Sequence, residues 1–128
     1  MDHKELLDKA IIVRKNAYAP YSGFKVGAAV LTKNGKVYTG VNIENISYGA
    51  TNCAERTAIF KAVSEGDREI KAIAIAADGD NIVYPCGICR QVIAEFADSN
   101  TAIICGNENG DYRIYTINGL LPEAFKSF

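Results

Sequence analysis

Three cysteines in two short segments have the residue type and spacing of metal ligands. The first segment is Cys53-Ala54-Glu55-Arg56, and the second, about thirty residues later, is Pro85-Cys86-Gly87-Ile88-Cys89-Arg90. Cysteine thiolates bind zinc well, and three protein ligands rather than four leave a coordination position for water, which is typical of catalytic zinc sites. A zinc-bound water beside a carboxylate is suited to hydrolysis. The pattern therefore predicts a hydrolytic zinc site held by Cys53, Cys86 and Cys89.

Glu55 is the carboxylate that this pattern places beside the metal. It can take a proton from a zinc-bound water as a general base and deliver it to a substrate as a general acid. A Cys-x-Glu followed by Pro-Cys-x-x-Cys is the layout of zinc deaminases, in which the glutamate is not a ligand. Zinc, three thiolates and a hydroxide carry a net charge of about −2, which we expect Arg56 and two helix N-termini, at roughly +0.5 each, to offset.

Helices and strands alternate along the chain, and both cysteine segments fall at the start of a predicted helix. The apolar periodicity predicts helices over 4–18, 53–65 and 86–97, strands over 26–31, 36–41, 70–77, 101–105 and 112–117, loops over 42–52 and 78–84, and a partly helical tail over 120–125. Pro20 is expected to end the first helix, and Asn34-Gly35 predicts a two-residue hairpin turn.

The order of these elements predicts the fold class. The near-continuous apolar run over 70–77 is typical of a strand buried on both faces, for which parallel pairing is the usual cause. Strands that alternate with helices indicate a mixed sheet covered on both faces. We therefore expect an α/β fold, a three-layer α-β-α sandwich with a five-stranded mixed sheet.

Length, charge and cysteine content narrow the class of protein. The 128 residues suffice for a single domain over 1–128. A net charge of −1 and the lack of a Lys/Arg run argue against a nucleic-acid or membrane partner. No signal peptide or transmembrane stretch is recognisable, so the expected location is cytoplasmic. In that reducing compartment a Cys-x-x-Cys is more often a metal or redox site than a disulfide.

Simpler interpretations of the same residues stay open. Cys86 and Cys89 could form a redox pair without metal. Cys105 could complete a four-cysteine structural zinc site, although a cysteine at the end of an apolar strand is more commonly a buried, inert thiol. Glu55 could be an acid favoured in the first turn of a helix by the helix dipole. His3 is expected to be a terminal surface residue and not a ligand.

Several segments beyond the cysteines carry a resemblance to a known family. They are Ala19-Pro20-Tyr21-Ser22-Gly23-Phe24-Lys25-Val26-Gly27-Ala28-Ala29, Gly40-Val41-Asn42-Ile43-Glu44-Asn45, and Leu120-Leu121-Pro122-Glu123-Ala124-Phe125. With the two cysteine segments, they make nearly the whole chain resemble the small zinc-dependent cytidine deaminases of the homotetrameric type. The resemblance implies one Zn²⁺ per chain on Cys53, Cys86 and Cys89, with Glu55 as the proton carrier.

The same resemblance implies a set of substrate-binding residues. Phe24 would stack on the pyrimidine ring, the backbone of Ala54 would contact the base, and Asn42 and Glu44 would bind the ribose, with Glu44 accepting from the 3'-hydroxyl. Tyr48 and Phe125 would come from neighbouring subunits of a homotetramer with shared active sites. From the residues alone, Phe24 could equally be a core residue, Asn42 and Glu44 parts of a solvated loop, Tyr48 a surface residue, and Phe125 a tail residue packed on its own domain.

These expectations combine into one predicted reaction. The chain is expected to deaminate cytidine and 2'-deoxycytidine hydrolytically to uridine and 2'-deoxyuridine, with release of ammonia, in cytoplasmic pyrimidine salvage. Glu44 disfavours a 3'-phosphodiester, which lacks the donated hydrogen bond and adds like charge, so a free nucleoside is favoured over a polynucleotide. The alternatives are a deaminase of another aminopyrimidine nucleoside, such as blasticidin S, and a non-enzymatic zinc or redox module.

Overall fold

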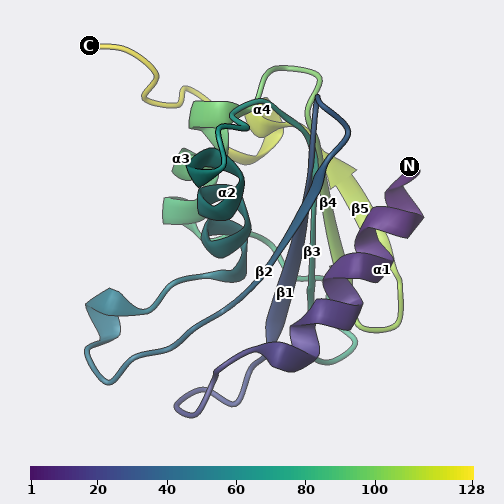
Figure 1. Ribbon diagram of the computed structural model, residues 1–128, viewed down its shortest axis with the longest axis vertical. Coiled ribbons are helices and arrows are strands. Elements are labelled where there is room, and N and C mark those ends of the chain that lie inside the picture. Colours follow the sequence, from purple (N-terminus) through teal and green to yellow (C-terminus); the bar gives the residue numbers. More distant parts are fainter.

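A sheet of five strands runs through the molecule in the computed structural model, which describes residues 1–128 (Figure 1). The strands are β1 (Val26–Thr32), β2 (Val37–Val41), β3 (Ile70–Ala77), β4 (Ala102–Asn107) and β5 (Tyr112–Tyr115). The helices are α1 (His3–Val13), α2 (Ala54–Ser64), α3 (Gly87–Phe96) and α4 (Ile117–Leu120), with 3-10 turns at Arg14–Asn16 and Tyr48–Ala50. No helix has the length and apolar character that a membrane crossing requires.

The strands lie in the order β2-β1-β3-β4-β5 and form a mixed sheet. Only β3 and β4 pair in parallel, and the other three pairs are antiparallel. Helix α1 packs on one face of the sheet, while α2 and α3 cover the opposite face (Figure 1). The predicted three-layer α/β sandwich with a five-stranded mixed sheet is therefore confirmed.

The alternation of side chains along β3 explains why both faces are covered. Ile73 and Ile75 point into the core beneath α2 and α3. Ala72, Ala74 and Ala76 point to the other face, where α1 packs with its leucines. Because successive side chains of a strand alternate between the two faces, large residues fill one layer and small residues let α1 lie close in the other. The predicted burial of this strand on both faces is confirmed, with parallel pairing on one side only.

Two glycines let helices approach the sheet from opposite sides. A Cβ atom on Gly27 would lie 2.1 Å from the carbonyl oxygen of Ala10 in α1. A Cβ atom on Gly40 would lie 2.4 Å from the backbone nitrogen of Ala58 and 2.8 Å from the carbonyl oxygen of Ala54 in α2. Real Cβ atoms do not come this close to backbone atoms. The absence of a side chain at Gly40 therefore allows α2, which begins just after Cys53, to pack directly against the β2 backbone.

The hairpin between β1 and β2 forms as predicted, but its turn differs from the predicted two-residue type. Thr32 N donates to the carbonyl of Lys36 at 2.9 Å, so three residues lie between this hydrogen-bonded pair. Only Gly35 has a positive φ, of 84°, whereas the expected turn needs positive φ at both central residues. Asn34 instead donates from its side chain to Asp67 Oδ1 at 3.1 Å. This contact gives the asparagine a role in anchoring the turn.

Three predicted element boundaries are wrong for local reasons. The first helix does not reach residue 18, because Tyr18 leaves it to exchange backbone hydrogen bonds with Asn42 and Glu44. The last strand stops at Tyr115 and not at residue 117, because the hydroxyl of Thr116 accepts from Gly119 N and begins α4. The helical part of the tail therefore lies at 117–120 and overlaps the predicted span of 120–125 only at Leu120. The predicted loop over 42–52 also contains a 3-10 turn.

Candidate active site

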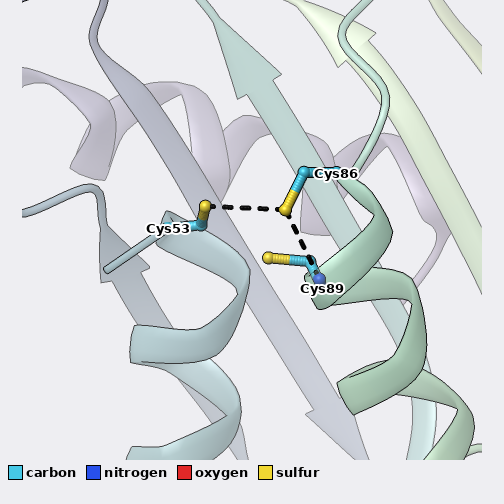
Figure 2. Close-up of side chains that lie close together, drawn as sticks. All are labelled: Cys53, Cys86 and Cys89. Carbon is cyan, nitrogen blue, oxygen red and sulfur yellow. Dashed lines mark hydrogen bonds between the residues drawn. The ribbon is translucent and has the colours of Figure 1, made fainter. Parts of the chain in front are cut away.

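The three cysteines lie at the beginnings of two helices that start side by side (Figure 2). Cys53 is the N-cap residue of α2 and Cys86 is the N-cap residue of α3, both with extended backbone. Cys89 lies in the first turn of α3 and is buried. A helix N-terminus carries a partial positive charge, so both helices favour negatively charged sulfur at this position.

The spacing of the sulfur atoms fits a zinc ion. The Sγ atoms of Cys53, Cys86 and Cys89 all lie within 4.8 Å of one another. Zinc–sulfur bonds in tetrahedral geometry separate two ligand sulfurs by about 3.8 Å, and the Sγ atoms of Cys53 and Cys86 are 3.9 Å apart (Figure 2). The backbone N–H of Cys89 donates to Cys86 Sγ at 3.4 Å and orients that thiol. The cluster fits one zinc per chain with a fourth corner left over.

Cys105 does not join this cluster. It is fully buried on β4, and its thiol is not among the grouped sulfur atoms. Burial raises its pKa to about 12, so it stays a neutral thiol. The expected burial of Cys105 is confirmed, and a four-cysteine site using this residue finds no support. His3 is exposed at the start of α1, as expected.

Arg56 contacts the cluster directly. Its Nη2 atom donates to Cys53 Sγ at 3.3 Å. The contact with the Cys89 thiol lowers the pKa of Cys53 to about 5, and the contact with Arg56 contributes in the same direction. The contact between the two thiols, together with burial, raises the pKa of Cys89. The contact with Arg56 therefore favours a negatively charged sulfur at Cys53. Arg56 thus lies beside one of the three clustered sulfur atoms.

Glu55 lies on the inner side of α2 and is buried, with 4% of its surface exposed. Burial raises the pKa of its carboxyl group to about 7, and the negative charge of Cys53 adds to the effect. A solvated first-turn acid would be exposed, so the simple dipole interpretation of Glu55 does not account for its burial. Together with Cys53, Ala54 and Cys86, the residue lines a cavity of about 290 Å³.

The same cavity is also lined by Phe24, Asn42 and Glu44. Phe24 is 45% exposed, so it is not a core residue. The Asn42 side chain accepts from Val26 N at 2.9 Å and donates to the carbonyl of Phe24 at 2.8 Å. These bonds leave one amide hydrogen and one lone pair of Asn42 for a ligand. The structure thus brings the predicted sugar-binding and base-stacking residues to one cavity with Cys53, Cys86 and Glu55.

Two predicted site residues lie outside this cavity in their own chain. Tyr48 is 76% exposed and lines an adjoining hollow of about 360 Å³, where its ring meets that of Tyr21 at a centroid distance of 6.0 Å. Phe125 is 62% exposed and makes an edge contact with Phe128. Its carbonyl oxygen accepts from Gln91 Nε2 at 2.8 Å, which ties the tail to α3. Neither ring is buried on its own domain.

Several cavity residues were missed by the sequence analysis. They are Ser22, Val26, Thr51, Asn52, Val83 and Tyr84. Four of them lie one to three residues before Cys53 or Cys86 in the chain, and this nearness was a usable signal. Ser22 stands two residues before Phe24, and nothing in its type distinguished it from an ordinary turn serine. Its contacts to Glu44 appear only in the folded chain.

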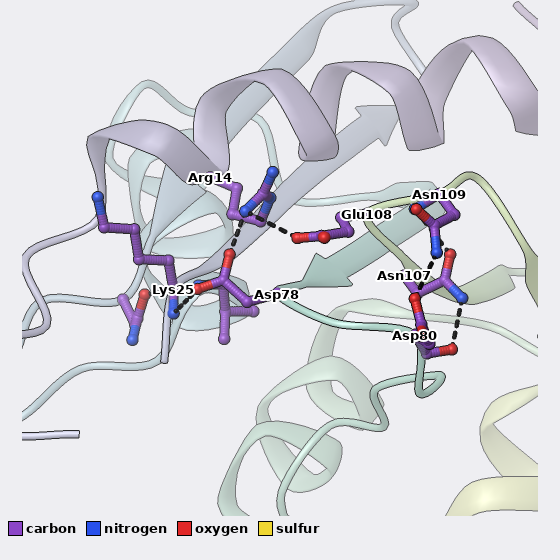
Figure 3. A network of polar contacts seen from close by, with 9 residues as sticks. Arg14, Lys25, Asp78, Asp80, Asn107, Glu108 and Asn109 are labelled. Atoms are coloured by element: carbon purple, nitrogen blue, oxygen red, sulfur yellow. Dashed lines mark hydrogen bonds and ion pairs between the residues drawn. The ribbon is translucent and has the colours of Figure 1, made fainter. Parts of the chain in front are cut away.

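A polar network holds the segment that carries Phe24 against the rest of the sheet (Figure 3). Asp78, directly after β3, accepts from Lys25 N at 3.0 Å and forms an ion pair with Arg14. Arg14 also pairs with Glu108 at 3.4 Å. Beside them, Asn107 and Asn109 both donate to Asp80, through its carbonyl and its side chain (Figure 3). The end of α1 and the loops after β3 and β4 thus support the cavity wall from behind.

The chain is similar to proteins of one kind in both sequence and structure. Residues 1–105 match the family described as the cytidine and deoxycytidylate deaminase zinc-binding region. The chain is 55% identical over 125 residues to a cytidine deaminase of Halalkalibacterium halodurans, covering 98% of this chain and 95% of that protein. A crystal structure of cytidine deaminase from Burkholderia pseudomallei superposes with a TM-score of 0.93 at 46% identity, covering 98% and 100% of the two chains. That of cytidine deaminase from Mycobacterium tuberculosis gives 0.87 at 38% identity, covering 99% of each.

Proposed function

Since the chain belongs to the cytidine and deoxycytidylate deaminase family, we propose that it converts cytidine and 2'-deoxycytidine to uridine and 2'-deoxyuridine, with water consumed and ammonia released. The observation that carries this proposal is the shared cavity, which a buried glutamate lines together with Cys53 and Cys86, two members of the three-thiol cluster. A redox pair would not require the third cysteine or the buried carboxylate. A structural zinc site would have closed its fourth corner with a protein ligand.

Each part of the cavity has a role in this reaction. The ring of Phe24 offers the base a stacking surface, and the backbone at Ala54 contacts its edge. Asn42 and Glu44 offer an amide and a carboxylate to the sugar hydroxyls. The chemistry that a zinc ion on Cys53, Cys86 and Cys89 supplies when bound is a water acidic enough to ionise near neutral pH.

Glu55 carries the protons of the reaction. It takes a proton from the attacking water and delivers it to N3 of the pyrimidine. It then takes the proton of the hydroxyl group formed on C4 and passes it to the amino group, which leaves as ammonia as the C4 carbonyl forms. Its burial keeps bulk water from exchanging these protons. Arg56 holds the Cys53 sulfur and offsets the negative charge of the thiolates.

Ultraviolet absorbance tests the proposal directly. Addition of cytidine or 2'-deoxycytidine to the purified protein should reduce the cytosine absorbance band, with one ammonia released for each nucleoside consumed. Blasticidin S and cytidine monophosphate, supplied in parallel, should be poorer substrates, because Glu44 disfavours added negative charge near the sugar. A stable cytosine band with zinc-loaded protein would overturn the proposed function. Faster turnover of blasticidin S would replace it with the alternative substrate.

We propose further that the chain works as a homotetramer in which Tyr48 and Phe125 complete the cavities of neighbouring subunits. Both rings are exposed and lie outside the cavity of their own chain, which supports this arrangement. Mixing two inactive variants, Glu55→Gln and Phe125→Ala, should restore activity, because the intact cavity of the second chain receives Phe125 from the first. Solution mass measurement checks the stoichiometry. Failure of the mixture to regain activity, with mixed assemblies demonstrated by mass, would contradict the shared site.

The reaction is proposed to serve pyrimidine salvage in the cytoplasm. All four cysteines are free thiols, which suits a reducing compartment. Growth of a host that depends on cytidine as its pyrimidine source, with and without the gene for this chain, tests the salvage role. Cell fractionation followed by the absorbance assay tests the location.

A further inference from the structure

The carboxylate of Glu44 is held by three donors from one short turn. Tyr21 N and Ser22 N donate to Oε1 at 2.9 and 3.1 Å, and the hydroxyl of Ser22 donates to Oε2 at 2.5 Å. An ionised carboxylate offers about four acceptor positions. With three of them occupied, one position remains, and it is on Oε2. Glu44 also lines the cavity, so this remaining acceptor is available to a ligand there.

The Ser22 hydroxyl has a second partner that links the sugar side of the cavity to the base side. Phe24 N donates to Ser22 Oγ at 3.0 Å. On the other side of the same residue, the carbonyl of Phe24 accepts from Asn42. Ser22 therefore lies between the carboxylate that faces the sugar and the backbone of the aromatic residue that faces the base. Ser22 itself lines the cavity.

We propose that Ser22 is a positioning residue that sets the preference for nucleosides with a free 3'-hydroxyl. Its hydroxyl holds Glu44 in the orientation that leaves a single acceptor on Oε2 for that group, and couples this orientation to the backbone of Phe24. The inference rests on the proposed function and deepens it, because it assigns the sugar specificity of the same site. Without the hydroxyl, Oε2 loses its internal donor, and only the two backbone donors to Oε1 still restrain the carboxylate.

A pair of substrates that differ in one hydroxyl group isolates this role. Ser22→Ala is assayed with 2'-deoxycytidine and with 2',3'-dideoxycytidine, the latter also as a competitive inhibitor of cytidine turnover. We expect kcat/KM for 2'-deoxycytidine to fall about tenfold, chiefly through KM, because a hydrogen bond to a charged group is lost. The values for 2',3'-dideoxycytidine should change less than about threefold. In a Glu44→Gln background, Ser22→Ala should have little further effect, since the two residues act as one unit.

Matched variants complete the experiment. Ser22→Thr keeps the hydroxyl and should restore the preference, and Ser22→Gly removes it as a second test should Ser22→Ala fold poorly. Ser64→Ala is the control, because Ser64 loses an exposed hydrogen bond of 2.8 Å at the far end of α2. Equal losses on both substrates, or none, would overturn the role of Ser22 while leaving the proposed function intact. Absence of turnover of any nucleoside by the unmodified, zinc-loaded protein would overturn the proposed function and this inference with it.

Discussion

The guanidinium of Arg56 lies within hydrogen-bond distance of the Cys53 thiol, 3.3 Å from Nη2 to Sγ, one residue beyond the glutamate that the proposed reaction uses. The start of α2 therefore carries a candidate metal ligand, the proposed proton carrier and the proposed counter-charge. The three residues cannot move independently, because helix geometry fixes their spacing.

Replacing Arg56 with Gln should weaken zinc retention or slow turnover by about 10–100-fold, the range common for residues that orient metal ligands. The cause is the loss of positive charge beside Cys53. The zinc content after dialysis against a weak chelator and kcat in zinc-supplemented buffer measure the two effects. Arg68→Gln is the control, because Arg68 is exposed and distant from the cluster. Normal zinc content together with normal turnover would show that the thiolates do not need the positive charge of Arg56.

Replacing Glu55 with Gln should keep zinc bound and lower kcat by about 10²–10⁴-fold, because a positioned acid-base group commonly contributes that much. Metal analysis and the absorbance assay on the same preparation measure both quantities. Glu65→Gln, an exposed change at the end of the same helix, should behave as the unmodified protein. Retained turnover in Glu55→Gln would show that Glu55 does not carry the protons of the reaction. Loss of zinc from this variant would indicate that Glu55 is a zinc ligand.

Gly40→Ala should destabilise the fold by about 1–3 kcal/mol, which is typical of overpacking. The added methyl group would meet backbone atoms of Ala54 and Ala58, which cannot rotate away as a side chain could. Urea unfolding followed by circular dichroism measures the change, and zinc affinity should fall with it because the start of α2 must shift. Gly49→Ala is the matched control, since nothing lies within 4 Å of its added Cβ. Equal stabilities of the two variants would contradict the close approach.

The titration of Glu44 offers a test by pH. Hydrogen bonds to its charged form, chiefly from the Ser22 hydroxyl, lower the pKa of Glu44 below its ordinary value of 4.5. A lowered pKa means that the carboxylate stays ionised as the pH falls through 4.5 and is protonated only below that point. Carbon-13 NMR titration of the Glu44 carboxyl group measures this pKa, which Ser22→Ala should raise and Ser64→Ala should leave unchanged. A pKa insensitive to Ser22→Ala would show that the hydroxyl does not hold the carboxylate.

The cysteine site could be predicted from sequence because its geometry is local. Cys86 and Cys89 are neighbours on one helical turn, and the partner Cys53 opens another helix, so few arrangements of the three are possible. The fold class was accessible for a similar reason. The apolar run of β3, with a helix before and after it in the chain, is compatible with few arrangements other than a sheet that has helices on both faces.

The boundaries and the finer contacts depended on partners distant in the chain. Tyr18 ends the first helical region by pairing with residues 42–44, and Asn34 gives up its expected turn conformation while contacting Asp67. Ser22 reaches Glu44 across 22 positions of sequence. Local propensity carries no information about such contacts, since they arise only when the sheet has brought the segments together.

The two cysteine segments lie on either side of β3 in the chain, and this placement has a thermodynamic consequence. A metal ion bound by both segments joins parts of the chain that are far apart when the chain is unfolded. The unfolded chain therefore binds the ion much more weakly than the folded chain does. Binding of the ion then increases the free energy of unfolding of the whole domain, and not only that of one loop. Adding zinc should accordingly raise the melting temperature and slow amide hydrogen exchange even in α1, on the reverse side of the sheet from the sulfur atoms.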